Sequence, residues 1–160
     1  MKRIFSVILI IAILAVGQLC AFASPETLDS DVEGTTSDLI IVTKPENQKD
    51  STFSTTYIIS GYGMGGTVVT LYSYNANDDV YEKVYNKTQY IDEAGGSQLL
   101  QNSAEVTIGS SGLFMGSVDL ATGENVILLR DENGDHVQYI KLSLTKFSYN
   151  IIDLIRALTV

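Results

Sequence analysis

Residues 111–134 constrain the fold more than any other part of the chain, because apolar residues recur there at alternate positions between turns. Leu113 and Met115 fall on one side of an extended segment, a period of two that is typical of a strand half-buried in a sheet. A tight turn is expected at residues 121–124. Asn133 and Gly134 form a dipeptide that tolerates the positive φ angles of a hairpin turn. The segment therefore predicts strand, turn, strand and turn, and an all-β protein.

The first 23 residues have the three parts of an export signal. Lys2 and Arg3 give the positive start, and residues 4–16 form an apolar run shorter than the roughly 20 residues of a membrane span. Ala-Phe-Ala at residues 21–23 fits the small-x-small cleavage rule, so cleavage is expected before Ser24. The chain is then secreted or otherwise extracytoplasmic, with no membrane insertion after cleavage.

Two other interpretations of this leader are disfavoured. One is an uncleaved membrane anchor, which the short apolar run and the small residues after it disfavour. The other is lipid attachment at Cys20, as in bacterial lipoproteins. The residue before such a cysteine is expected to be small, and here it is Leu19.

Removal of residues 1–23 leaves 137 residues, the usual size of one domain, and no cysteine. An exported domain without disulfides must be stabilised by its apolar core. The leader holds two basic residues and no acidic one, so 8 basic residues then face 19 acidic ones, a formal charge of −11. This charge disfavours nucleic acid and anionic lipid surfaces as partners.

The chain divides into four parts. After the signal, residues 24–37 are acidic and poor in apolar residues, which indicates a flexible lead-in. Residues 38–146 read as short strands between turn-forming clusters, the pattern of a β-sandwich. Residues 46–51 and 90–102 are expected to be loops. About eight strands are expected, at residues 39–43, 56–60, 67–74, 80–86, 104–108, 113–120, 125–130 and 136–144.

Residues 147–160 change from the period of a strand to that of a helix. Ile151, Leu154, Ile155 and Leu158 fall on one helical face, and Ser148 is placed to cap the start. A short C-terminal amphipathic α-helix is therefore expected. Its apolar face either packs on the sandwich of the same chain or docks on a partner, and the sequence does not choose between the two.

Two strings resemble ligand-binding motifs. Residues 61–66 match the dinucleotide fingerprint G-x-G-x-x-G, but the β-branched run after them predicts a strand instead of the helix that the mechanism needs. The string is interpreted as a glycine-rich hairpin. Residues 131–135 alternate oxygen ligands as calcium loops do, but positions six and twelve hold His136 and Leu142 instead of Gly and Glu. A hairpin turn is expected there, with a weak surface calcium site as the alternative.

No catalytic, cofactor or metal residues are expected. His136 is the only histidine, so no histidine cluster can hold a zinc ion, and loss of Cys20 with the signal removes the only thiol. No serine lies in a nucleophile elbow. Carboxylates are plentiful, but a single small sandwich offers little concave surface for a hydrolase. The prediction is a protein that is not an enzyme.

Tyrosines give the functional clue. Tyr72 and Tyr74 are two residues apart and share one face of a strand, and Tyr81, Tyr85 and Tyr90 follow in and after the same predicted hairpin. Exposed rings would form a platform for sugars or a protein, whereas cross-strand pairing on the sheet would use the same residues structurally. The possible binding surface is therefore Tyr72, Tyr74, Tyr81 and Tyr85.

The turn and core residues together resemble a bacterial Ig-like domain over about residues 38–145. The long insert between Tyr74 and Ala104 and the C-terminal helix depart from the usual module. The resemblance rests on Lys44-Pro45, Ile59-Ser60-Gly61, Gly66 to Tyr72, Gly112-Leu113-Phe114, Val118-Asp119-Leu120, Gly123-Glu124-Asn125, Ile127 and Asp131 to Gly134.

The resemblance implies an Ig-like antiparallel β-sandwich of about seven to eight strands, used as a spacer or an adhesive module. The expected function is a secreted, non-catalytic binding or scaffolding module. Its partner is an extracellular or cell-envelope protein, or a polysaccharide. A carbohydrate-binding module that uses the tyrosine-rich face is the alternative.

Overall fold

The computed structural model describes residues 24–33, 38–91, 97–103 and 105–148. The expected signal at residues 1–23 and the helical face of the expected C-terminal helix lie outside these residues. Within them the protein is all-β, as predicted, and the one helical element is the short 3-10 turn η1 (Glu46–Gln48). The described part contains twelve strands, four more than the eight expected. Three of the additional strands fall in the expected lead-in and loops, and the fourth was not separated from the strand expected at residues 80–86.

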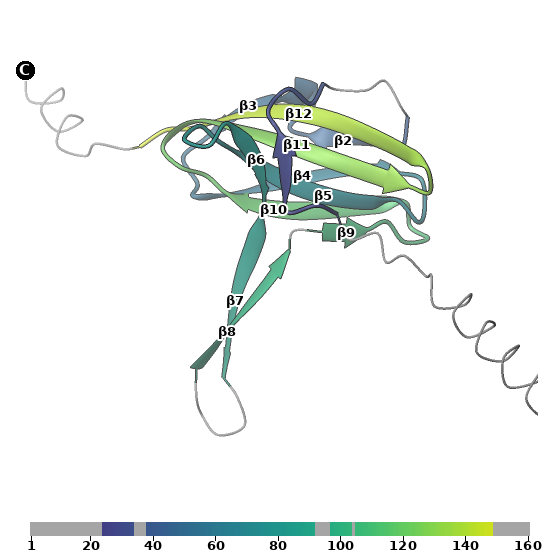
Figure 1. Cartoon of the computed structure of the whole chain (residues 1–160). Coiled ribbons are helices and arrows are strands. Elements are labelled where there is room, and N and C mark those ends of the chain that lie inside the picture. Colours follow the sequence, from purple (N-terminus) through teal and green to yellow (C-terminus); the bar gives the residue numbers. More distant parts are fainter. Residues whose placement is uncertain (1–23, 34–37, 92–96, 104, 149–160) are drawn as a thin grey trace, which may run out of the picture.

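Two sheets form the body of the molecule, and a separate two-stranded hairpin projects from it (Figure 1). The larger sheet has the order β1-β6-β5-β11-β12-β3, with β9 also paired to β5, and the smaller sheet has the order β10-β4-β2. The larger sheet consists of β1 (Thr27–Asp29), β3 (Lys49–Thr52), β5 (Val68–Asn75), β6 (Val80–Lys83), β9 (Glu105–Thr107), β11 (Gly123–Asn133) and β12 (His136–Lys146). The smaller sheet consists of β2 (Ile40–Lys44), β4 (Thr56–Gly63) and β10 (Leu113–Asp119), and the hairpin of β7 (Tyr85–Ile91) and β8 (Ser97–Ser103).

The main core lies between the two sheets. Residues of β2, β4, β5, β10, β11 and β12 point into it at alternate positions, as the period of two predicts. Gly116 of β10 leaves room for Leu71 of β5, since a Cβ at residue 116 would lie 2.7 Å from the Leu71 side chain. Each fully buried aliphatic side chain contributes about 1.5–3 kcal/mol to folding. The largest fully buried aliphatic members are Ile59, Leu71, Ile108, Ile127, Leu129, Leu142 and Leu144.

A second apolar cluster lies on the other face of the larger sheet. Tyr72, Tyr81 and Leu128 form it, and Leu28 from the N-terminal segment packs against it. Residues 24–31 cover this cluster and shield it from solvent. We call this segment the N-terminal strap.

The N-terminal strap corrects the expectation of a flexible lead-in at residues 24–37 for the part that it spans, residues 24–31. Strand β1 pairs with β6, and the Lys83 N–H donates to Glu26 O at 2.9 Å. Ser24 is buried, and its hydroxyl lies 2.7 Å from that of Thr70. The Tyr72 hydroxyl donates to Pro25 O at 2.7 Å. An acidic segment with little apolar content therefore joins the sheet through backbone and hydroxyl hydrogen bonds.

Residues 46–51 also differ from the expected loop. The chain leaves β2 in the smaller sheet, passes η1, and enters the larger sheet as β3, which pairs in parallel with β12. The register runs from Lys49 opposite Ser143 to Thr52 opposite Lys146. One continuous segment thus contributes an edge strand to each sheet.

The glycine-rich string at residues 61–66 leads into a strand, as predicted, but it is not a hairpin. Strand β4 belongs to the smaller sheet and β5 to the larger one, so the turn carries the chain from one sheet to the other. Gly61 permits close packing within the smaller sheet, because a Cβ there would lie 2.2 Å from Ile41 O and 2.7 Å from the Phe114 ring. The predicted hairpin near Asn133 is confirmed: Asn133 and His136 close it, and Gly134 has a φ of +61°.

Residues 90–102 were expected to be a loop, but those that the structure describes, 90–91 and 97–102, belong to the strands of the β7–β8 hairpin. The two strands pair in an antiparallel register from Tyr85 opposite Ser103 to Ile91 opposite Ser97. Figure 1 shows this hairpin pointing away from the two sheets. Polar residues dominate both strands, so the apolar alternation that identifies a half-buried strand is missing there.

Candidate binding face

The outer face of the smaller sheet carries exposed apolar side chains from all three strands, which is unusual for a face turned to water. In one row, Ile41 of β2, Tyr62 of β4 and Leu113 of β10 lie opposite one another. These side chains are 50%, 48% and 65% exposed. Together with Ile58, Met64 and Met115 they form what we call the apolar face: Ile41, Ile58, Tyr62, Met64, Leu113 and Met115.

The local sequence explains why this face is apolar. Strand β4 buries Tyr57 and Ile59 in the core, while Ile58 and Tyr62 occupy the alternating outward positions. Apolar residues at both parities suit a strand covered on both sides, yet the described residues cover only one side of this sheet. Within that part of the chain the second side is left exposed to solvent.

Most polar positions on the same outer face are uncharged, and Lys44 at the end of β2 stands opposite Ser60. Between the apolar side chains lie Thr43, Ser60 and Ser117, and the charged Asp119 stands at the end of β10, where it accepts a hydrogen bond from the Thr56 hydroxyl at 2.7 Å. The whole chain carries 19 acidic residues against 10 basic ones. The apolar face is thus a neutral area on a strongly acidic protein.

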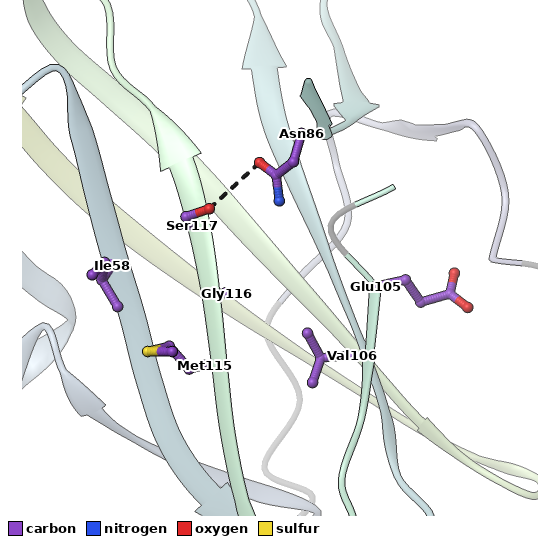
Figure 2. A pocket seen from close by; sticks show the side chains of 7 residues that line it. All are labelled: Ile58, Asn86, Glu105, Val106, Met115, Gly116 and Ser117. Atoms are coloured by element: carbon purple, nitrogen blue, oxygen red, sulfur yellow. Dashed lines mark hydrogen bonds between the residues drawn. The ribbon is translucent and has the colours of Figure 1, made fainter. Parts of the chain in front are cut away.

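A pocket of about 380 Å³ opens at the β10 edge of this face (Figure 2). Ile58 and Met115 belong to both the pocket and the apolar face. Across the pocket, Glu105 forms an ion pair with Lys83 at 3.1 Å. The Ser117 hydroxyl lies 3.5 Å from the Asn86 side-chain oxygen. The lining residues are Ile58, Asn86, Glu105, Val106, Met115, Gly116 and Ser117.

A second pocket, of about 330 Å³, lies at the opposite end of the face. Ile41, Tyr62 and Met64 line it together with Asp38 and Gly63. The apolar face therefore connects two depressions, and a ligand lying along β4 and β10 would contact both.

The structure does not bring the predicted tyrosines together as an exposed platform. Tyr72 and Tyr81 are 0% and 2% exposed, beneath the N-terminal strap. Burial raises the pKa of the Tyr72 phenol above its usual value. A ring buried in this way cannot stack on a sugar, which corrects the expected use of these two residues.

The other tyrosines of the predicted surface are half-buried and hydrogen-bonded to carboxylates. Tyr74 donates to Asp79 at 2.7 Å and packs against Tyr81, with ring centroids 5.4 Å apart. Tyr85 donates to Glu26 of the N-terminal strap. In both cases the hydrogen bond to a carboxylate is the main cause of a raised phenol pKa. The side chain of Tyr90 lies outside the described part.

The alternating oxygens of residues 131–135 do not form one site. Asp131 is fully buried in the sandwich, whereas Asp135 is exposed in the turn. Burial raises the pKa of the Asp131 carboxyl to about 8. Neither of its oxygens has a hydrogen-bond partner in the structure. Among the described residues no three acids, histidines or cysteines gather in a way that could hold a metal ion.

The sequence analysis missed the apolar face, although a signal was present. The alternation at residues 113–116 predicts a half-buried strand, but both of its sides are apolar, so one of them must face outward. Residues 56–63 are similarly apolar at both parities.

No protein-family model matches the sequence, and neither a curated protein nor a solved structure matches it significantly. Within the described residues there is no helix of the length and apolar character that a membrane crossing requires. The site is therefore interpreted from its own geometry.

Proposed function

We propose that this chain is an exported, non-catalytic binding module with an Ig-like fold, which attaches to an envelope or extracellular protein through its apolar face. The observation that carries the proposal is the row formed by Ile41, Tyr62 and Leu113, three large side chains exposed in register across a whole sheet. Contiguous exposed apolar area of this kind marks interaction sites in soluble proteins.

The strand order supports the Ig-like part of the proposal. In Ig domains, strands A, B and E share one sheet, and C, F and G the other, with C′ added beside C in the variable type. The order β2-β4-β10 corresponds to A-B-E, and β6-β5-β11-β12 corresponds to C′-C-F-G. The connections that cross between sheets, β4 to β5 and β10 to β11, fall where B–C and E–F connections do.

The chemistry of the face favours a protein partner. The acidic body repels other acidic surfaces, while the neutral apolar face loses little electrostatic free energy on contact. Tyr62 and Met115 are residue types enriched in the centres of protein interfaces. The buried Tyr72 and Tyr81 remove the main support for the carbohydrate alternative, and Tyr62 is left as the exposed ring on this face.

The test measures saturable binding of the labelled chain, from Ser24 onward, to whole cells of the organism that encodes it. We expect Leu113→Lys and Met115→Lys to abolish binding, because each places a charge where the partner must exclude water. Asn77→Lys adds the same charge in the exposed β5–β6 loop and should leave binding unchanged.

Two controls separate the alternatives. Treatment of the cells with protease should remove binding if the partner is a protein. Binding that resists protease and is competed by the cells' polysaccharide would support the carbohydrate alternative instead. An absence of saturable binding, or equal binding by the Leu113→Lys chain, would overturn the proposal for the apolar face.

A further inference from the structure

Strand β10 has a free backbone edge. The Gly63 N–H donates to Gly112 O at 2.8 Å, and the Leu120 N–H donates to Thr55 O at 2.7 Å. Since hydrogen-bonded positions alternate in an antiparallel pair, the even-numbered residues of β10 bond to β4. The N–H and C=O groups of Met115 and Ser117 therefore point away from β4. In the described part of the chain, β4 is the one strand paired with β10.

A pocket of about 380 Å³ lies beside this edge. The pocket of Figure 2 opens between β10 and the residues Asn86 and Val106, and it includes Met115, Gly116 and Ser117 in its wall. Across it, the Ser117 hydroxyl lies 3.5 Å from the Asn86 side-chain oxygen. An unpaired edge of this kind is a template for pairing with another chain.

The β7–β8 hairpin also lacks a neighbouring strand. Among the described strands, β7 and β8 pair with each other alone and leave the body of the molecule (Figure 1). An isolated two-stranded hairpin is marginally stable in water and gains stability from a third strand. Strands β8 and β10 match in length, at seven residues each.

Composition indicates which hairpin strand is free to pair. Strand β7 contains Lys87, and lysine on an edge strand is a device that opposes further pairing. Strand β8 reads SQLLQNS and contains no charged residue. An uncharged strand can approach a second acidic copy of the chain without like-charge repulsion.

We propose that β8 of one copy pairs with the free edge of β10 in a second copy, and that the reciprocal pairing closes a symmetric dimer by exchange of the two hairpins. Such an interface uses the same two surfaces on each copy, so the reciprocal exchange closes after two copies. The inference concerns the β10 edge and does not depend on what the apolar face binds.

The first test is the mass in solution of the chain from Ser24 onward, which holds every described strand. We expect sedimentation equilibrium to give twice the chain mass at high protein concentration. Ser117→Pro removes an N–H at the free edge and spares the ladder to β4, because proline is tolerated at outward-facing edge positions. Its mass should fall to that of a single chain. Ser117→Ala loses the same hydroxyl, keeps the N–H, and should stay dimeric.

Complementation then identifies the pairing. A copy with Leu99→Pro and Leu100→Pro has a blocked β8 and an intact β10 edge, so alone it should be monomeric. Mixed with the Ser117→Pro chain, which has the opposite defect, it should form a heterodimer through one of the two exchanges. Circular dichroism of each variant verifies that the strands of the body persist.

The outcomes decide the proposal. A wild-type chain that stays monomeric at high concentration overturns it. A dimer that survives Ser117→Pro, or that is lost only in Leu113→Lys, places the contact elsewhere and overturns it as well. Two folded variants that are each monomeric and do not combine would likewise exclude hairpin exchange.

Discussion

The side-chain amide of Gln138 on β12 bonds both backbone groups of Ile40 on β2. The Ile40 N–H donates to Gln138 Oε1 at 3.0 Å, and the Gln138 amide nitrogen donates to Ile40 O at 3.4 Å. Strand β2 is an edge of the smaller sheet and β12 lies in the larger one, so a single buried amide joins the sheets where no backbone ladder does.

Gln138→Ala should destabilise the protein by about 2–4 kcal/mol, because it leaves a buried N–H and C=O unsatisfied and opens a small cavity. The free energy of unfolding in urea, followed by far-ultraviolet circular dichroism, measures this effect. Gln138→Glu keeps an acceptor for the Ile40 N–H and loses the donor to Ile40 O, so this variant separates the effects of the two hydrogen bonds. A change below about 0.5 kcal/mol for Gln138→Ala, within the range of ordinary surface substitutions, would contradict the role of this amide.

The stability of the protein should fall as pH rises from about 4 to about 8, because of Asp131. Burial raises the pKa of this carboxyl to about 8 in the folded state, against about 3.9 in an unfolded chain. Between these values the unfolded state releases the proton and the folded state keeps it, so unfolding becomes more favourable by up to about 1.4 kcal/mol per pH unit.

Asp131→Asn should remove this pH dependence. At pH 4 the variant and the wild type should unfold at similar urea concentrations, and at pH 8 the variant should be more stable by on the order of 3–5 kcal/mol. Asp135→Asn, in the exposed turn nearby, is the matched control and should leave the slope unchanged. A parallel pH profile for the Asp131→Asn and wild-type chains would show that the buried carboxyl has found a partner.

Gly61→Ala should destabilise the protein by more than 2 kcal/mol, since the new methyl group would collide with the Ile41 carbonyl and the Phe114 ring. Gly109→Ala is the matched control, because a Cβ there meets nothing within 4 Å. Thermal unfolding of the two variants side by side checks the comparison. Equal melting temperatures would mean that β2 shifts to make room.

Deletion of the N-terminal strap should expose the cluster around Tyr72 and Tyr81. A chain that begins at Val32 loses the β1–β6 ladder and the cover over two buried rings, and we expect a loss of about 3 kcal/mol or more. Tyr72→Phe removes only the hydrogen bond to Pro25 O and should cost about 1 kcal/mol. Quenching of tyrosine fluorescence by iodide should increase in the deleted chain and stay unchanged in Tyr72→Phe.

The sequence predicts those strands whose inward and outward residues differ in polarity. The alternation around Phe114 and Val118 locates β10, and the Asn133-Gly134 dipeptide locates the last hairpin. Strands β1, β3, β7 and β8 carry mostly polar residues, and their place in the fold depends on backbone pairing with segments far away in the chain. Local patterns carry no information about such pairing.

The candidate site was predictable in part. Tyrosines were expected at a surface because their rings suit binding, but burial depends on whether another segment covers the strand, and the N-terminal strap covers Tyr72. The apolar face, in contrast, does have a signal in the sequence. Ile58 and Tyr62 are apolar residues at the outward positions of β4, where the described chain does not bury them. The sequence alone does not distinguish a strand that the same chain covers on both sides from a strand whose outer side stays exposed.

The parallel pairing of β3 with β12 determines how the fold bears tension. The chain enters this pair at Lys49 and leaves it at Lys146, at opposite ends of the two strands. A pull along the chain, once β1 and β2 have come away, slides β3 and β12 past each other and loads their hydrogen bonds at the same time. An antiparallel hairpin pulled from its open end would lose its bonds one after another. The β3–β12 pair should therefore resist a pull along the chain through all of its hydrogen bonds together.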